Sequence, residues 1–163
     1  MKTLQNSVVK KAELKDKEAI KNLMQFYFYD FSEFVEAYVG NDGLFGEYPY
    51  LNNYWEEKER FPYLVEKDGK LAGFILVREV QEDNNNLYWS IAEFFIMKKF
   101  RLSGLGMYAA HHVFESHKGN WEVFQIETNK PAQAFWRKVI NDYTKGQFVE
   151  RKEEGKIIQA FCS

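Results

Sequence analysis

The sequence contains a single cysteine, which excludes a fold held together by internal disulfides. Cys162 is the last residue but one of the 163-residue chain. Disulfide scaffolds need paired cysteines and an oxidising compartment, whereas a lone cysteine fits a reducing one. We therefore expect a cytoplasmic protein whose core is stabilised by packing alone.

Long apolar runs are absent as well. No stretch approaches the roughly 20 apolar residues that a membrane-spanning helix needs, and residues 1–6 contain no apolar run of signal-peptide length. The sequence also has no internal repeat and no linker rich in Pro, Gly or Ser. Together with the chain length, these absences predict one domain over residues 1–163 that has no membrane partner.

Neither sign of charge is in excess. The chain has 22 Lys and Arg against 24 Asp and Glu, a net charge of −2. Nucleic-acid backbones are bound by surplus Lys and Arg, so nucleic acid is not expected as a partner. The three histidines, His111, His112 and His117, fall in one predicted helix without the spacing of a metal site, and no metal is expected.

Aromatic residues, in contrast, are abundant. The chain has 15 Phe, 10 Tyr and 4 Trp, and a chain near this size buries about 68–70% of its unfolded surface. These side chains are enough for a full core. The densest stretch, residues 26–34, holds more aromatic rings than one face of a helix can bury.

Hydrophobic periodicity predicts the order of the elements. Alternating apolar residues indicate strands, and apolar residues three or four apart indicate helices. The resulting order is β-α-α-β-β-β-α-β-α-β-β, a mixed α/β (α+β) domain. Asp68-Gly69 between two strand-like runs predicts an antiparallel hairpin. The expected strands cover residues 7–14, 63–66, 71–80, 87–97, 121–126, 146–151 and 156–161. The four helices of this order cover residues 16–28, 31–39, 104–118 and 131–140, and a further short helix, not counted in the order, is expected over residues 53–58.

The most informative segment is a glycine turn, residues 101–106, between a predicted strand and a predicted helix. Its glycines permit positive φ and leave room for a ligand to approach the backbone. The helix that follows adds unpaired N–H groups and the positive end of its dipole. Converging amides at a helix N-terminus bind phosphate groups. The turn therefore predicts a phosphate-bearing cofactor.

Two other phosphate-binding motifs contain a glycine-rich turn before a helix, the dinucleotide fingerprint and the Walker-type loop. Residues 104–109 match G-x-G-x-x-A, the dinucleotide fingerprint, and Glu127 lies at the distance expected of a ribose ligand. However, residues 98–103 separate Gly104 from the end of its strand, whereas a dinucleotide turn leaves its strand almost at once. The preceding strands also form a hairpin instead of parallel units. A Walker-type loop is excluded because no Gly-Lys-Ser/Thr follows at the required spacing.

The pattern R-x-x-G-x-G after a strand, together with the element order, resembles the GNAT superfamily of N-acetyltransferases. A second block, residues 129–136, is similar to that family's N-x-x-A-x-x-F-Y segment. The resemblance extends from about Val8 to Phe161. It implies a GNAT-like fold, whose central sheet is mostly antiparallel with one parallel, splayed strand pair.

The resemblance also implies acetyl-CoA as co-substrate, without a metal. Main-chain N–H groups of the turn would bind the pyrophosphate, and Arg101 would either neutralise its charge or cap the turn. The backbone of Phe95 and Ile96 would bind the pantetheine arm, and residues of the second block would flank it. The expected cofactor-binding residues are Phe95, Ile96, Arg101, Leu102, Ser103, Gly104, Leu105, Gly106, Met107, Asn129, Ala132, Phe135 and Trp136.

For catalysis the resemblance gives two candidate residues. Glu93, on the strand that leads into the turn, is the candidate base, provided that its strand register points it into the site. Trp136 stands where the family often has a tyrosine that protonates the leaving thiolate. An indole N–H donates a hydrogen bond but does not release its proton, so Trp136 is expected to contact the sulfur without acting as an acid.

The resemblance predicts an N-acetyltransferase that acts on a small or terminal amine. Because the family's first helices line the acceptor site, Tyr29 and Asp30 in the aromatic stretch are candidate substrate residues for a cationic amine. The alternative function is a non-catalytic acyl-CoA sensor or interaction module, which the missing tyrosine leaves open. The expected oligomeric state is a monomer, or a homodimer formed through the open edge of the closing hairpin.

Overall fold

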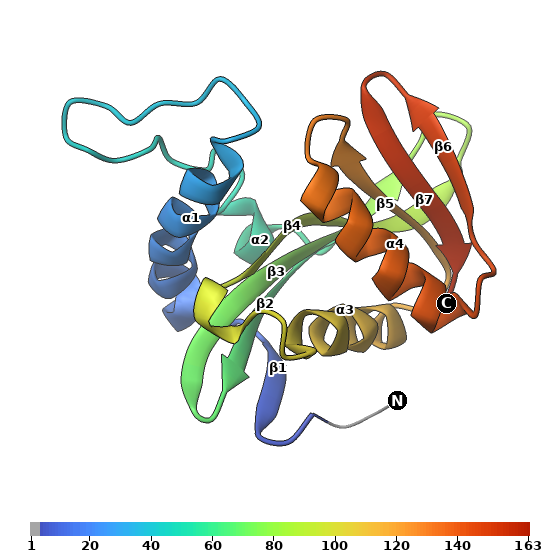
Figure 1. Ribbon diagram of the computed structural model, residues 1–163, viewed down its shortest axis with the longest axis horizontal. Helices are drawn as coiled ribbons and strands as arrows, with labels where there is room; N and C mark the ends of the chain where they lie inside the picture. The colour runs from blue at the N-terminus through green and yellow to red at the C-terminus, as the bar shows by residue number, and fades with distance from the viewer. Residues whose placement is uncertain (1–3) are drawn as a thin grey trace.

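In the computed structural model, which describes residues 4–163, seven strands form one sheet (Figure 1). All neighbouring strands are antiparallel except β4 and β5, which are parallel. The mostly antiparallel sheet with one parallel pair confirms the predicted fold class. The order across the sheet is β1 (Ser7–Lys11), β2 (Arg60–Lys67), β3 (Lys70–Gln81), β4 (Leu87–Ile96), β5 (Asn120–Ile126), β7 (Lys156–Cys162) and β6 (Val149–Glu153).

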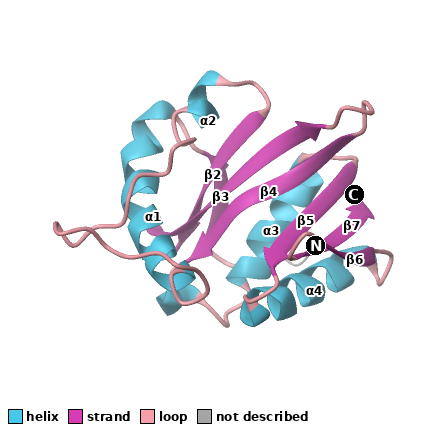
Figure 2. Ribbon diagram, turned by 90° about the horizontal axis from the view of Figure 1, so that it is seen from above, coloured by secondary structure: helices cyan, strands magenta, loops and turns pink. Residues whose placement is uncertain are grey.

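Helices cover the two faces of the sheet unequally (Figure 2). One face packs against α3 (Leu105–Ser116) and α4 (Lys130–Thr144), and the other carries α1 (Lys17–Phe31) and the short α2 (Asn53–Glu56). Two short 3-10 turns, η1 (Leu14–Asp16) and η2 (Lys98–Phe100), precede α1 and follow β4. Over β5, β6 and β7 the second face carries no helix (Figure 1).

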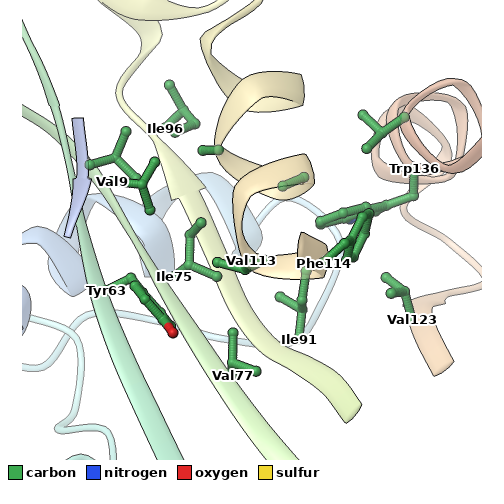
Figure 3. Packing of buried hydrophobic residues seen from close by; sticks show 14 of the residues in the cluster. Val9, Tyr63, Ile75, Val77, Ile91, Ile96, Val113, Phe114, Val123 and Trp136 are labelled. Carbon is green, nitrogen blue, oxygen red and sulfur yellow. The ribbon is translucent and has the colours of Figure 1, made fainter. Parts of the chain in front are cut away.

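Each face has its own apolar core. Under α3 and α4, the side chains of Val113, Phe114 and Trp136 meet sheet residues such as Val77 and Ile91 (Figure 3). Under α1 and α2 a smaller cluster forms, and its members include Ile20, Met24, Leu51, Tyr54, Leu64, Phe74, Leu76 and Phe95. The two clusters follow from the alternation of side chains along β3, which sends Phe74 and Leu76 to one face and Ile75 and Val77 to the other.

The predicted helix over residues 31–39 was wrong. Helix α1 ends at Phe31, where the amide of Ser32 closes the last turn on the carbonyl of Phe28, and residues 32–52 form turns and irregular loop. The segment is rich in aromatic and β-branched residues, which favour helix only weakly. Tyr38 is 79% exposed and Val39 is 50% exposed, so no core stabilises a helical face there. The short helix α2 takes the place of the second helix in the element order.

Several boundaries also differ from the prediction. Strand β1 ends at Lys11, because the chain then turns into η1 instead of continuing to residue 14. Helix α4 continues to Thr144, and Lys145 and Gly146 end it in the left-handed conformation. The last hairpin therefore begins at Val149, later than the predicted residue 146.

Candidate active site

The parallel strands β4 and β5 part soon after they meet. Among the described residues, Trp89 and Trp121 are the one pair in register between them, although β4 continues to Ile96 and β5 to Ile126. Beyond Trp89 the edge of β4 that faces β5 is therefore without a strand partner. This opening lies next to the glycine turn, which follows β4 in the chain after the short turn η2.

The glycine turn adopts the left-handed backbone that its sequence predicts. Leu102 has φ of 60° and Gly104, the N-cap of α3, has φ of 85°. These positive φ values reverse the chain sharply between η2 and α3. The side chain of Leu102 points into solvent, so it does not cover the turn.

The turn presents a continuous set of unpaired amides. The first helical hydrogen bond of α3 joins the N–H of Tyr108 to the carbonyl of Gly104. Within residues 4–163, no acceptor receives a hydrogen bond from the amides of residues 102–107. Unpaired amides at the positive end of a helix dipole favour a bound anion. The geometry therefore agrees with the predicted phosphate site.

The two sequence blocks that carried the family resemblance lie side by side. A Cβ atom at Gly106 would stand 3.1 Å from the ring of Phe135 and 3.8 Å from the side chain of Ile96. The first turn of α3 can therefore approach α4 and the end of β4 because position 106 is glycine. Phe135 in turn stacks beside Phe94, with ring centroids 5.5 Å apart.

Arg101 links the glycine turn to the end of β4 and to α1. Its Nε donates to the carbonyl of Ile96 at 2.7 Å, and its guanidinium forms an ion pair with Asp30 at the end of α1. Lys98 lies 3.8 Å from the same carboxylate. Asp30 therefore neutralises cations of the turn. Tyr29, the other predicted acceptor residue, is 67% exposed.

Asn129 and Trp136 occupy α4 at the side of the strand opening. The Oδ1 of Asn129 accepts a hydrogen bond from the amide of Ala132 at 3.1 Å and so caps the helix. Trp136 is 6% exposed and packs edge-on against Phe94, with centroids 4.9 Å apart. In the described part of the chain, the indole N–H of Trp136 and the Nδ2 of Asn129 have no acceptor, so both donors are available.

Glu93 lies on the opposite face of the sheet from Trp136. The register pairs Leu76 with Glu93 but Val77 with Ile91, so Ala92 is the extra residue of a β-bulge. The bulge places the Glu93 carboxylate under α1, where its Oε2 accepts a hydrogen bond from the hydroxyl of Tyr27. Burial raises the pKa of Glu93, and the hydroxyls of Tyr27 and Tyr48 oppose that rise.

The tyrosines around Glu93 come from α1 and from the loop after it. Gln25 on α1 holds this loop through two hydrogen bonds to the backbone of Phe45, of 3.2 and 2.9 Å. The loop then brings Tyr48 towards Glu93. Burial, and next the negative charge of Glu93, raise the pKa of both Tyr27 and Tyr48. Both hydroxyls therefore remain protonated, and that of Tyr27 donates to Glu93.

Glu93 opens into a cavity of about 390 Å³ on the part of the sheet that no helix covers. The cavity extends from the loop after α1 to the hairpin of β6 and β7. Its wall combines aromatic and apolar side chains with charged groups of both signs. The lining residues include Tyr48, Tyr50, Arg60, Arg78, Tyr88, Ser90, Ala92, Glu93, Glu122, Phe124, Arg151, Lys156 and Ile158.

Sequence reasoning missed most of this cavity. Tyr29 and Asp30 do not line it, whereas Tyr48 and Arg78 do. The one available signal was the alternation along β3, which puts Arg78 on the same face as Phe74 and Leu76. Tyr48 had no signal, because it comes from a loop without a readable pattern.

Other predicted features have structural roles. The Nε2 of His111 lies 3.0 Å from the carbonyl of Val139, and the Nε2 of His117 lies 2.7 Å from the hydroxyl of Tyr63. No group of three or more His, Cys, Asp or Glu side chains in residues 4–163 is close enough to hold a metal ion. Over the same residues, the helices are too short or too polar to cross a membrane.

The dinucleotide interpretation of residues 104–109 is wrong. The sheet is mostly antiparallel, whereas dinucleotide-binding folds are built from successive parallel strands. Glu127, which that interpretation makes a ribose ligand, forms an ion pair with Lys152 of β6.

Comparison with known proteins agrees with the fold. Residues 18–141 match the family model described as Acetyltransferase (GNAT) family, which is well over half of the chain. The chain therefore belongs to the GNAT family of acetyltransferases. No curated protein sequence matches it significantly.

Solved structures similar to this chain share its fold at low sequence identity. A GNAT-family acetyltransferase from Streptococcus agalactiae is 16% identical, with a TM-score of 0.70 over 99% of this chain and 98% of that one. Naa50 of Arabidopsis thaliana, in complex with a bisubstrate analogue of CoA, is 13% identical, with a TM-score of 0.60 over 97% and 99%. An aminoglycoside acetyltransferase from an uncultured soil metagenomic sample is 9% identical, with a TM-score of 0.62 over 82% and 87%.

Proposed function

We propose that this protein transfers an acetyl group from acetyl-CoA to the amine of an acceptor that lies in the cavity at Glu93. The observation that carries the proposal is the placement of two sites on opposite faces of one strand opening. Unpaired amides of residues 102–107 lie on one side, and a buried carboxylate with tyrosine partners lies on the other. A cytoplasmic monomer or homodimer remains part of the proposal.

On the cofactor side, the residues present fit a CoA molecule. The amides of residues 102–107 would hold its pyrophosphate, because unpaired amides at a helix N-terminus favour a bound anion. The exposed backbone edge of β4 at Phe95 and Ile96 would hydrogen-bond its pantetheine arm. The Nδ2 of Asn129, which has no acceptor in the described residues, would donate a further hydrogen bond to that arm. Ala132, Phe135 and Trp136 would flank the arm with apolar surface.

On the acceptor side, Glu93 would remove the proton that keeps an amine from reacting. When bound, acetyl-CoA supplies an activated acetyl group, and the acceptor nitrogen needs its lone pair free to take it. Because burial raises its pKa, the Glu93 carboxylate is a better proton acceptor than an exposed glutamate. Tyr27 holds this carboxylate in a fixed orientation through its hydroxyl.

Trp136 would assist departure of the thiolate without transferring a proton. Its N–H is a donor and stays protonated at working pH. A thiol has a pKa of about 8.5, so a thiolate that is stabilised by one hydrogen bond leaves readily and takes its proton from water. This role is compatible with the absence of the usual tyrosine.

The test is CoA release measured with a thiol reagent over a panel of primary amines, with calorimetric titration of CoA in parallel. Release above the rate of acetyl-CoA hydrolysis, together with CoA binding, is the expected result. If CoA binds but no amine causes CoA release, the second candidate function, a non-catalytic acyl-CoA sensor, is favoured. That candidate rests on the replacement of the family's tyrosine by Trp136. No CoA binding contradicts both.

A further inference from the structure

The charges that line the cavity differ in how they are neutralised. The chain has five arginines, and four of them form ion pairs: Arg60 with Glu57 at 2.8 Å, Arg101 with Asp30, Arg137 with Glu150 at 2.7 Å, and Arg151 with Glu122 at 3.0 Å and Glu153 at 2.9 Å. Arg78 is the exception. In residues 4–163 it has no carboxylate within 4.0 Å and no hydrogen-bond partner.

Arg78 is also placed where a ligand can reach it. It lines the cavity and is partly buried on β3, opposite Ser90 of β4. Partial burial of a cation costs free energy unless an anion compensates for the lost hydration. A guanidinium matches the two oxygens of a carboxylate or phosphate with parallel N–H groups. The missing anion is therefore expected to come from the molecule that fills the cavity.

The other cations that line the cavity are already paired or are exposed, whereas its acidic lining residues are Glu82, Glu93, Glu122, Glu153 and Glu154. Arg151 is held between two glutamates, and Arg60 lies over the rings of Tyr50 and Tyr54, with its Cζ 5.6 and 5.3 Å from their centroids. Lys156 is exposed, and its Nζ lies 4.5 Å from the ring centroid of Phe124. Among residues 4–163, Arg78 is thus the partly buried cation of the cavity wall that lacks an anionic partner.

The sheet register sets the separation of Arg78 from Glu93. Glu93 pairs with Leu76, two residues before Arg78 on the same strand and on the same face. Two residues along an antiparallel strand span about 6.8 Å. A small molecule can therefore place one group at Glu93 and a second at Arg78, and Ala92, Phe124 and Ile158 add apolar surface to the same cavity.

From this geometry we infer that the acceptor carries an acidic group, a carboxylate or a phosphate, that Arg78 binds while the amine lies at Glu93. The acceptor class is a small amine with an acidic group, such as an amino acid or an aminoalkyl phosphate. The inference rests on the proposed function for the fate of the amine, but binding of the acidic group to Arg78 does not require turnover.

The experiment compares acceptors that share an amine and differ only in the acidic group. Lysine is paired with cadaverine, phenylalanine with phenethylamine, and phosphoethanolamine with ethanolamine. We expect the acid-bearing member of at least one pair to have a kcat/KM at least 10-fold higher. The first two pairs report a carboxylate and the third a phosphate. Equal use of both members in every pair, or preference for the plain amines, overturns the inference and leaves the proposed function intact.

Two variants locate the effect. Arg78→Gln is expected to raise KM for the acid-bearing acceptor at least 10-fold and to change kcat/KM for its plain partner less than 2-fold. Arg137→Gln removes an arginine that lies outside the cavity and is the matched control, with both acceptors unchanged. If Arg78→Gln lowers kcat/KM equally for both members of a pair, with thermal unfolding unchanged, then Arg78 does not bind the acidic group and the inference is overturned.

A binding measurement separates this inference from the proposed function. The acid-bearing amines are titrated calorimetrically into the CoA-bound protein and into its Arg78→Gln variant. Binding that the variant loses supports the inference even if no amine releases CoA, in which case the proposed function fails alone. Binding that the variant retains overturns the inference.

Discussion

The two faces of the sheet at the strand opening offer a ligand different kinds of groups. On the face of α3 and α4, the groups available to a ligand are mainly backbone amides of residues 102–107, surrounded by apolar side chains. On the face of α1, they are side chains from β3, β4, β5, β7 and the loop after α1. One site is a short continuous segment, and the other is assembled from distant parts of the chain.

The two sites also differ in how many side chains they constrain. A backbone site constrains few side chains, since it needs only glycines at a turn and a helix start. A side-chain site changes with every lining residue. Family membership therefore supports CoA as a ligand, whereas the proposed acceptor would depend on residues such as Arg78 and Tyr48.

The largest expected effect is on the side-chain face. Replacing Glu93 with Gln removes the proposed base but keeps its shape, and general base catalysis contributes about 10²–10⁴-fold. We expect kcat to fall at least 100-fold while calorimetry shows unchanged CoA affinity. Glu115→Gln, on the surface of α3, is the control. A fall of less than 3-fold in Glu93→Gln contradicts the assignment of the base.

The next effect is on the backbone face. Valine at position 106 would clash with Phe135, where a Cβ already stands 3.1 Å from the ring, and would push the first turn of α3 away from α4. Overpacking of this kind costs about 1–3 kcal/mol. We expect Gly106→Val to weaken CoA binding at least 10-fold.

Gly46→Ala is the matched control for that variant, because nothing lies within 4 Å of a Cβ at position 46. Its CoA affinity should equal that of the wild type. Unchanged CoA affinity in a folded Gly106→Val protein would show that the turn does not bind CoA.

A smaller effect is expected in the pH dependence. Burial raises the pKa of Glu93, and the hydrogen bond from Tyr27 lowers it. The base acts as a carboxylate, so kcat/KM is lost as pH falls through this raised pKa. Tyr27→Phe removes the donor that stabilises the carboxylate and should move the acidic limb to higher pH. Tyr29→Phe alters an exposed neighbour and should leave the limb in place. If the acidic limb of the kcat/KM profile of Tyr27→Phe lies at lower pH than that of the wild type, this account is contradicted.

The smallest effect tests the donor on the cofactor face. Trp136→Phe keeps an aromatic ring next to Phe94 but removes the N–H, and one hydrogen bond contributes about 0.5–1.5 kcal/mol. We expect kcat to fall about 2- to 10-fold, with the CoA dissociation constant nearly unchanged. Trp55→Phe removes an indole N–H that bonds the carbonyl of Ala12 and serves as the control. Equal kcat for Trp136→Phe and wild type shows that the indole does not contact the thiolate.

Local sequence signals predicted the fold and the backbone of the glycine turn well. The Asp68-Gly69 hairpin, the glycine turn and the start of α4 all depend on residues close together in the chain, and the structure has each of them. The predicted helix over residues 31–39 failed because its aromatic pattern resembled a core stripe. Whether such a stripe is buried depends on other elements, and here Tyr38 and Val39 are exposed.

The sequence by itself determined the element order, the single parallel step and the glycine turn, because backbone conformation and hydrophobic alternation are set by neighbouring residues. Only the tertiary structure decided that Glu93 faces Tyr27, through the bulge at Ala92. It also decided that, among residues 4–163, Arg78 has no ion-pair partner while the other arginines do. Strand register and the meeting of distant side chains depend on long-range packing, and no local pattern carries that information.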